Sequence, residues 1–422
     1  MYLTNKKKYQ LLYDISQQVR DTLDLDEIMD HLLDAVKTVV DYDAAGIFVL
    51  NQDLVYDRRE QPKEVIAGVA RRGFDPKPPE EDAMLSQGRG IIGYVISTGS
   101  SLVIPDVSLD LRYIEGRSRT RSEITVPIVR NKRAIGALNL ESDQLAAFDE
   151  DDLDVLQFFA DAASISIEKA MLHRQLVAKE LLDKQLELAR DLQSQLFPKN
   201  SPQIPGYDIA GICLPAEEIG GDYYDFIPLR RGRLGVAIAD ISGNGIASAL
   251  VMTAFRGLLR IHTQSSQRLE KIACAINRQL PEFTAGSQYV TALYALLNPV
   301  TDEFTFVNCG HHPPMLIHPD GSTDSLHEHG PALGIIENVA YPINKTCLNP
   351  GDIMVLYTDG AVEISNKDGV EIGYERLRVT IHRNRDLPAD TLIQRVIQTA
   401  REFSGFQRFP DDFTLVIIKR LS

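Results

Sequence analysis

The chain has 422 residues, enough for two or three domains that each bury a sizeable core. Its 44 Lys and Arg against 59 Asp and Glu give a formal net charge of −15, which disfavours a nucleic-acid-binding or membrane-binding protein. No apolar run approaches the ~20 residues that a membrane span needs, and the first residues lack the apolar core of a signal peptide. These features predict a cytoplasmic, multidomain protein.

The four cysteines of the chain are widely spaced. They form no CxxC pair that would indicate a zinc or redox site, and their spacing gives no disulfide framework. We therefore expect Cys213, Cys274, Cys309 and Cys347 to be small buried side chains in a reducing compartment.

The first part of the chain alternates helical and strand patterns. Apolar residues recur at helical spacing over 25–40, and a second, short helix is expected from about residue 88 to residue 99. Strands are expected over residues 44–50, 64–70, 102–105, 123–129 and 134–140, the last two joined by a turn at Asn131-Lys132. This order predicts an α+β domain with a mostly antiparallel sheet.

The segments GRGIIGYVISTGSSLVIPDV, SEITVPIVRNKRAIGALNLES and FDEDDLDVLQFFADAASISIEKA resemble a GAF domain, a module that senses small molecules or signals. Cyclic-nucleotide-binding GAF domains carry an Asn-Lys pair and a Phe that three residues separate from Asp-Glu. Here Asn131-Lys132 is present, but Phe148 is followed at once by Asp149-Glu150. We interpret Asp149 as the cap of a helix with an acidic first turn, and the ligand of the domain stays unassigned.

A long helix is predicted next. Residues 149–197 contain neither Pro nor Gly, and as one helix they would span about 70 Å. The apolar residues of its second half include Leu172, Leu176, Leu182, Leu186, Ala189, Leu192 and Leu196, most of which lie three or four positions from the next. This stripe predicts a parallel coiled coil that pairs two copies of the chain, the alternative being a helix packed on its own domains. Pro198 ends the pattern.

The third part carries acidic motifs at the ends of apolar runs. Asp222 lies in GGDYYDF, Asp240 in ADISGNG, Asp359 in LYTDGAVE, and Asp411 and Asp412 open DDFTLVII. Carboxylates that converge at about 4 Å repel one another by about 4 kcal/mol per pair at an effective dielectric constant near 20, so they protonate or gather cations. Carboxylate oxygens suit Mg²⁺ or Mn²⁺, and two such ions match four aspartates. Each motif alone is also compatible with an ordinary Asx turn.

Residues 200–422 resemble the PPM family of metal-dependent serine/threonine phosphatases, in the SpoIIE-like branch. The matching segments are GGDYYDF, ADISGNGIASALVMTAFR, VNCGHHPPMLI, LYTDGAVEISN and DDFTLVII. The resemblance implies two packed β-sheets flanked by helices and a site for two divalent cations, Mn²⁺ or Mg²⁺. It implies that Asp240 bridges the ions, that Asp222, Asp359 and Asp411 are the other ligands, that the carbonyl of Ile241 binds one ion, and that Asp412 holds a metal-bound water. Direct attack of a metal-shared hydroxide on phosphorus would follow.

Some features depart from that family pattern. Asn244 stands where the family usually has His or Lys, and no Arg lies between Gly206 and Phe226 to bind phosphate. A zinc site made by His311, His312, His318, His327 or His329 is conceivable. The resemblance, however, implies that the Gly310-His311 turn is structural, and we interpret His327 and His329 as exposed. The basic residues in 376–385 could guide an acidic partner or form a solvated helix face.

The sequence thus predicts an α+β GAF sensor (1–160), a helical linker (161–199) and an α-β-β-α PPM phosphatase (200–422). The expected substrate is a phosphorylated serine or threonine of a partner protein, a STAS-domain anti-sigma antagonist in a bacterial signalling pathway. Two alternatives stay open. One is an inactive partner-binding module, which Asn244 favours, and the other is a metal-dependent hydrolase of a small phosphoester.

Overall fold

The computed structural model describes residues 22–50, 66–74, 89–284 and 288–421. The chain divides into two compact units, residues 1–181 and 182–422, and each is described here by itself. Helix α5 (Glu150–Ser194) contributes residues to both units and confirms the long helix expected from the lack of Pro and Gly. None of the described helices combines the length and the apolar character that a membrane span requires.

The first unit is built on a five-stranded antiparallel sheet with the strand order β2-β1-β5-β4-β3. Its strands are β1 (Ala44–Leu50), β2 (Ile66–Arg72), β3 (Leu102–Ile104), β4 (Ser122–Arg130) and β5 (Arg133–Ser142). The five strands expected from the sequence are confirmed, apart from the expected start of the second strand at residue 64, which lies outside the described residues.

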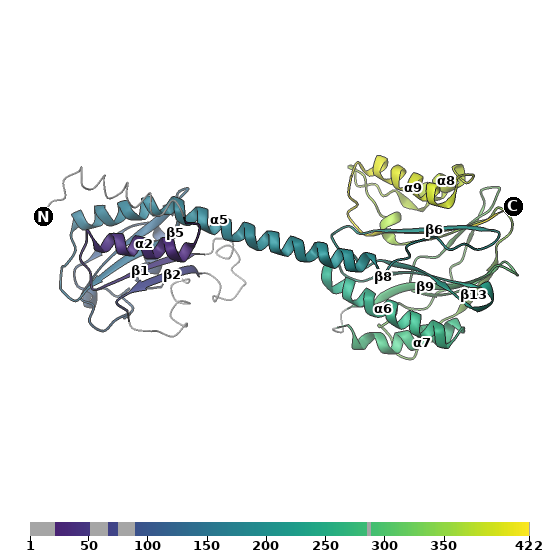
Figure 1. The fold of residues 1–422 in the computed structure, drawn as a ribbon, viewed down its shortest axis with the longest axis horizontal. Coiled ribbons are helices and arrows are strands. Elements are labelled where there is room, and N and C mark those ends of the chain that lie inside the picture. Colours follow the sequence, from purple (N-terminus) through teal and green to yellow (C-terminus); the bar gives the residue numbers. More distant parts are fainter. Residues whose placement is uncertain (1–21, 51–65, 75–88, 285–287, 422) are drawn as a thin grey trace. The chain divides into compact units, whose positions relative to one another are not determined.

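Two helices cover one side of this sheet, α2 (Leu25–Lys37) and the first part of α5 (Figure 1). Asp24 caps α2 by accepting the N–H groups of Asp26 and Glu27, and the buried face of the helix repeats at helical spacing. The short helix α4 (Gly90–Thr98) packs against β4 and β5 and ends at Gly99, whose φ of 67° is the left-handed conformation that glycine adopts readily.

Local structure accounts for the residues that could have suggested a cyclic-nucleotide site. Asn131 and Lys132 form the hairpin turn between β4 and β5, both with positive φ. One carboxylate oxygen of Asp149 accepts the N–H groups of Asp151 and Asp152 at 2.9 and 3.0 Å. The interpretation of Asp149 as the cap of α5 is therefore confirmed.

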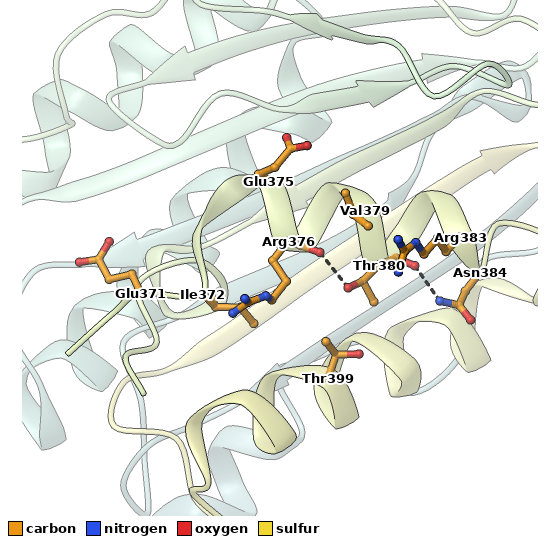
Figure 2. Close-up of a pocket in the computed structure, with 9 residues that line it drawn as sticks. All are labelled: Glu371, Ile372, Glu375, Arg376, Val379, Thr380, Arg383, Asn384 and Thr399. Atoms are coloured by element: carbon orange, nitrogen blue, oxygen red, sulfur yellow. Dashed lines mark hydrogen bonds between the residues drawn. The ribbon is translucent and has the colours of Figure 1, made fainter. Parts of the chain in front are cut away.

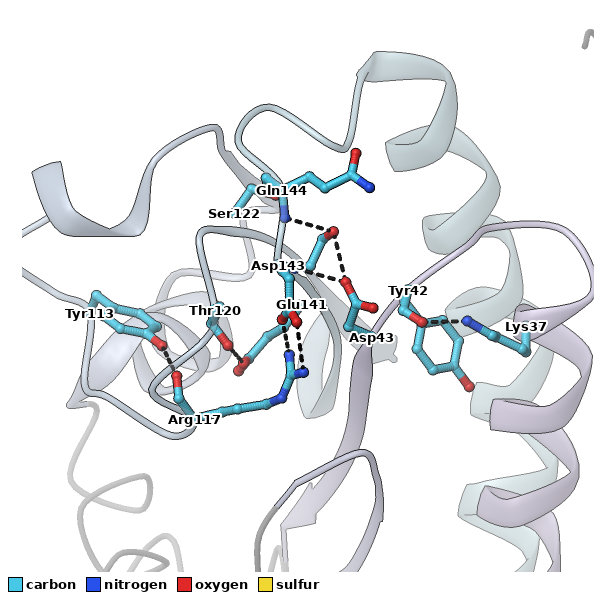
Figure 3. Close-up of polar contacts among 11 residues, drawn as sticks. Lys37, Tyr42, Asp43, Tyr113, Arg117, Thr120, Ser122, Glu141, Asp143 and Gln144 are labelled. Atoms are coloured by element: carbon cyan, nitrogen blue, oxygen red, sulfur yellow. Dashed lines mark hydrogen bonds and ion pairs between the residues drawn. The ribbon is translucent and has the colours of Figure 1, made fainter.

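A network of polar side chains ties the loop before β4 to the end of β5 (Figure 3). Arg117 forms an ion pair with Asp143, and Thr120 donates a hydrogen bond to Glu141. Asp43 accepts the backbone N–H of Asp143 at 2.7 Å. These contacts fix one end of the sheet through three separate segments of the chain.

A buried carboxyl group lies beside this network. Glu123 on β4 is paired in register with Glu141 on β5, is 3% exposed, and accepts a hydrogen bond from Thr125 at 2.8 Å. Burial, and then the neighbouring charge of Glu141, raise the pKa of Glu123 to about 8. Glu123 is therefore largely protonated at neutral pH in the folded protein.

The second unit contains two five-stranded antiparallel sheets. One has the order β13-β10-β9-β8-β7, with β7 (Tyr223–Pro228), β8 (Leu234–Ile241), β9 (Val290–Asn298), β10 (Glu303–Cys309) and β13 (Ile343–Cys347). The other has the order β12-β11-β14-β15-β6, with β6 (Tyr207–Leu214), β11 (Met315–Ile317), β12 (Thr323–Ser325), β14 (Ile353–Tyr357) and β15 (Phe413–Arg420).

Apolar side chains from both sheets meet in a shared core, so the sheets pack face to face. The outer face of the first sheet is covered by α6 (Gly245–Ser265) and α7 (Leu269–Gln279), and that of the second by α8 (Gly373–Arg383) and α9 (Ala389–Ser404), as Figure 1 shows. The result is the predicted α-β-β-α arrangement. It also explains why β8 is an almost continuous apolar run, because Val236 and Ile238 face the shared core while Ala237 and Ala239 face α6 and α7.

The residues after α5 belong to the second unit. Leu196 and Phe197 pack against its apolar clusters, and Arg256 of α6 donates a hydrogen bond to the carbonyl of Leu196 at 2.9 Å. All four cysteines are free thiols. Cys309 is buried as expected, whereas Cys213 and Cys274 are only partly buried. The expectation is wrong for Cys347, which is exposed on β13, an edge strand of its sheet.

We predict that Glu123 makes the first unit less stable as the pH rises from about 4.5 to 8. The unfolded chain releases the proton of Glu123 near pH 4.5 and the folded unit keeps it to about pH 8, so the stability contributed by the protonated form is lost across that window. Thermal unfolding of the full chain between pH 5 and 8 should show a weaker pH dependence for Glu123→Gln than for the wild type. Asp154→Asn, at an exposed position of α5, is the control, and equal pH dependence in all three proteins would contradict the prediction.

Candidate metal centre

The four aspartates expected as metal ligands stand at the ends of neighbouring strands. Asp222 directly precedes β7, and Asp240 is the next-to-last residue of β8 in the same sheet. Asp359 follows the end of β14, and Asp411 precedes the start of β15 in the other sheet. The antiparallel registers of β7 with β8 and of β14 with β15 bring the members of each pair to the same end of their sheet.

A buried hydroxyl connects the two sheets at this end. Thr358, just after β14, donates a hydrogen bond from Oγ1 to Oδ2 of Asp222 at 2.7 Å. The backbone N–H of Thr414 on β15 donates to the same Oγ1 at 3.1 Å. Both threonines are fully buried, so the carboxylate of Asp222 is held in one orientation by groups from the opposite sheet.

Asp240 is the member of the cluster that faces most of the others. Burial raises its pKa to about 7, with further contributions from the negative charges of Asp359, Asp411 and Asp412. Burial and the charge of Asp240 raise the pKa of Asp222 well above its ordinary value. The structure thus gathers four carboxyl groups around Asp240, and the repulsion among the five favours either protons or cations.

Asp412 accepts backbone N–H groups on both of its carboxylate oxygens, whereas Asp359 and Asp411 each accept one on a single oxygen. Its Oδ1 accepts the N–H of Ala216 at 2.8 Å, and its Oδ2 accepts those of Gly221 at 2.7 Å and Asp222 at 3.2 Å. A Cβ atom at Gly220 would lie only 2.3 Å from Oδ2, so the chain needs glycine there to approach this closely. Asp412 therefore anchors the turn that carries Asp222.

The loop after β8 places two further residues of the sequence motif. The carbonyl oxygen of Ile241 lies beside Gly221, since a Cβ atom at Gly221 would come within 2.9 Å of it. Asn244 is exposed at the start of α6, and its side chain makes no capping hydrogen bond. Ile241 is thus next to the Asp222 turn, and the amide of Asn244 is accessible to solvent.

His312, one of the histidines considered for a zinc site from the sequence, lies beside Asp359 of the cluster. Ligand atoms of His312, Asp359 and Glu363 lie within 4.8 Å of one another. The available signal was the position of Glu363 four residues after Asp359 in the motif LYTDGAVE, just beyond the one-turn segment η5 (Asp359–Ala361) that follows β14. These residues extend the set of candidate ligands on the Asp359 side.

The neighbouring histidine has a structural role. Burial lowers the pKa of His311 to about 3, so its ring is neutral, and its Nδ1 lies 3.0 Å from the hydroxyl of Thr291. The side chain of Asn308 bonds to both backbone groups of His311. The expectation of a structural Gly310-His311 turn is confirmed, as is the exposure of His327 and His329.

A separate hollow of about 580 Å³ lies along α8 and α9 (Figure 2). None of the five clustered aspartates lines it. Its lining includes two arginines and two glutamates, and Arg376 stacks over the ring of Phe403 at 4.0 Å. The basic run of residues 376–385 is thus partly used in internal packing and does not form a uniform basic face.

Comparison with known proteins assigns both units. Residues 22–168 match the family model described as GAF domain, and residues 230–421 match the model described as Stage II sporulation protein E (SpoIIE). The chain joins a GAF domain to a SpoIIE-type phosphatase domain of the PPM family. The phosphatases of this family depend on metal ions.

Relatives and solved structures agree with this assignment. The phosphoserine phosphatase RsbU of Bacillus subtilis is 27% identical over 237 residues, which cover 56% of this chain and 70% of RsbU. The phosphoserine phosphatase RsbP of the same organism is 26% identical over 188 residues, which cover 43% of this chain and 45% of RsbP. The SiaA PP2C domain of Pseudomonas aeruginosa has a TM-score of 0.50 at 17% identity, covering 58% of this chain and 99% of that domain, and it shows the same fold.

We predict opposite effects on stability for two aspartates of the site in metal-free buffer. Asp240→Asn should raise the melting temperature of the second unit by about 2–4 °C, for a change near 1 kcal/mol, because it removes a charge that its neighbours repel. Asp412→Asn should lower it, because an amide cannot accept all three N–H groups and each one left unpaired costs about 1–3 kcal/mol.

The measurement is calorimetric unfolding of the full chain with a chelator present. Destabilisation of similar size in both variants would contradict the distinction between a repelled carboxylate and an anchoring one.

Proposed function

We propose that the protein is a Mn²⁺- or Mg²⁺-dependent phosphatase that hydrolyses phosphoserine or phosphothreonine in a partner protein. The observation that carries the proposal is the convergence of Asp222, Asp240, Asp359 and Asp411 from two rigid sheets. The donors are carboxylate oxygens, which fit hard divalent cations. The family assignment and the similarity to two phosphoserine phosphatases support the same chemistry.

The residues of the site divide into those that would hold the cations and those that position them. Asp240, which lies near the other carboxylates, would hold both cations. Asp222, Asp359 and Asp411 would complete the set, with the carbonyl of Ile241 beside the turn of Asp222. Bound cations would supply an activated water and neutralise charge on the phosphate. Thr358 orients Asp222 by its hydrogen bond, while Asp412 holds the preceding turn and needs no role as a direct ligand. His312 and Glu363 add donors next to Asp359.

The proposed substrate is a phosphorylated STAS-domain anti-sigma antagonist, and the proposed setting is cytoplasmic signalling with the GAF domain as sensor. The exposed position of Asn244 bears on catalysis, because a neutral amide cannot donate a proton to the leaving group as His⁺ or Lys⁺ could. We infer that this lowers the rate and leaves metal binding intact, since the carboxylates do not depend on Asn244.

We also propose that α5 pairs two copies of the chain. Leu172, Leu176, Leu182 and Leu192 are all more than half exposed on this helix, where a solvated helix would carry polar residues. A parallel coiled coil would bury them. Through that pairing, a signal in the GAF domain could reach the phosphatase domain along one uninterrupted helix.

The activity is tested by phosphate release from phosphoserine-containing STAS proteins. The wild-type full chain should require Mn²⁺ or Mg²⁺, Asp240→Asn should reduce turnover at least about 100-fold, and Asp154→Asn, in the first unit, should match the wild type. Full activity of Asp240→Asn or activity with a chelator would contradict the proposed site. Faster turnover of p-nitrophenyl phosphate than of every phosphoprotein would favour the small-phosphoester alternative, and no turnover of any substrate would favour the inactive module.

The pairing is tested by the molar mass of the full chain in solution. Light scattering should give the mass of a dimer for the wild type and a lower mass for the double variant Leu172→Glu/Leu176→Glu, because four charges would enter an apolar seam. Glu180→Gln, at an exposed polar position of α5, should remain dimeric. A monomeric wild type, or a double variant that pairs as tightly, would contradict the coiled coil.

A further inference from the structure

The last turn of α5 contacts the turn that carries Asp222. Gln193 donates a hydrogen bond from Nε2 to the carbonyl of Gly220 at 2.7 Å, and its Oε1 accepts the N–H of Gly220 at 3.2 Å. One side-chain amide thus satisfies both backbone groups of one residue. This residue lies two positions before Asp222.

The opposite side of the same turn is held by Asp412, which accepts the N–H groups of Gly221 and Asp222. The turn is therefore fixed between two groups, a carboxylate at the start of β15 and an amide at the end of α5. No side chain of the turn itself can do this, because Gly220 and Gly221 have none. A glycine pair has more conformational freedom than other residues, so external groups must hold it in one conformation.

We propose that Gln193 is a positioning residue that sets the cation affinity of the Asp222 side of the site. The proposal rests on the proposed function, in which Asp222 is a ligand. Groups that orient a ligand typically change metal affinity 10–100-fold when they are removed. Gln193 differs from Asp412 in lying on the helix that also contributes to the GAF unit.

The contact between Gln193 and Gly220 depends on the position of the end of α5. A shift of α5 by one residue rotates its side chains by about 100°, which would move the Gln193 amide away from Gly220. Two further contacts fix the orientation of this end, the packing of Phe197 near the rings of Tyr223 and Tyr224 and the hydrogen bond from Arg256 to Leu196. Tyr223 follows Asp222 directly, so the helix end contacts the chain on both sides of that carboxylate.

The test is Mn²⁺ binding by the full chain, measured by electron paramagnetic resonance and by the Mn²⁺ dependence of phosphate release. Gln193→Ala should weaken Mn²⁺ binding at least 10-fold, while turnover at saturating Mn²⁺ stays within about threefold of the wild type. Gln193→Met keeps the length of the side chain without its hydrogen bonds and should lose as much affinity. Gln195→Ala, an exposed glutamine two residues further on, should bind as the wild type does.

Wild-type affinity in both Gln193 variants would overturn the inference, as would equal losses in Gln195→Ala. Circular dichroism of each variant shows whether a loss of Mn²⁺ affinity comes from unfolding. If Gln193→Ala unfolds, the Mn²⁺ affinity of Gln193→Met, which preserves packing, decides whether the inference holds. Failure of the proposed function gives a different result: either the wild type releases no phosphate, or Asp240→Asn binds Mn²⁺ and hydrolyses phosphoserine as the wild type does.

Discussion

The buried carboxylates of the second unit repel one another, and the structure of the site depends on holding them together. Asp222 and Asp240 stand at strand ends of one sheet, and Asp359 and Asp411 stand at strand ends of the other. Burial, and then neighbouring negative charges, raise the pKa values of Asp222, Asp240 and Asp411. No single strand could hold such a set together, because its groups would separate or protonate. Two packed sheets hold it, since each contributes a pair of strand ends and the shared core fixes the pairs relative to each other.

The supporting contacts are as informative as the carboxylates themselves. Thr358 reaches from the second sheet to Asp222 in the first, and Asp412 reaches from the start of β15 to the turn before β7. Both link the sheets at the point where charge accumulates. Gln193 adds a third connection, from a helix end to the same turn. The position of Asp222 therefore depends on three distant parts of the chain, and a change in any of them would alter the proposed metal site.

The resemblance to the PPM family predicted the sandwich, and the acidic cluster could be predicted because each aspartate stands beside an apolar strand in a short motif. The sequence also predicted α5, since a stretch without Pro or Gly leaves few alternatives to a helix. It could not predict that Asp412 binds three backbone N–H groups, because those partners lie 190 or more residues away. For a similar reason the sequence could not predict the contact of Gln193 with Gly220, or that His312 lies close to Asp359 and Glu363. Such contacts depend on how strands are ordered, which composition and periodicity do not specify.

The central claim is that the converging aspartates gather divalent cations, and counting bound ions tests it most directly. Equilibrium dialysis of the full chain against Mn²⁺ should give about two ions per chain for the wild type and at most one for Asp240→Asn, which lacks the proposed bridging carboxylate. Asp154→Asn should bind as many ions as the wild type. A wild-type protein that binds no Mn²⁺, or an Asp240→Asn variant that binds the same number with the same affinity, would contradict the account.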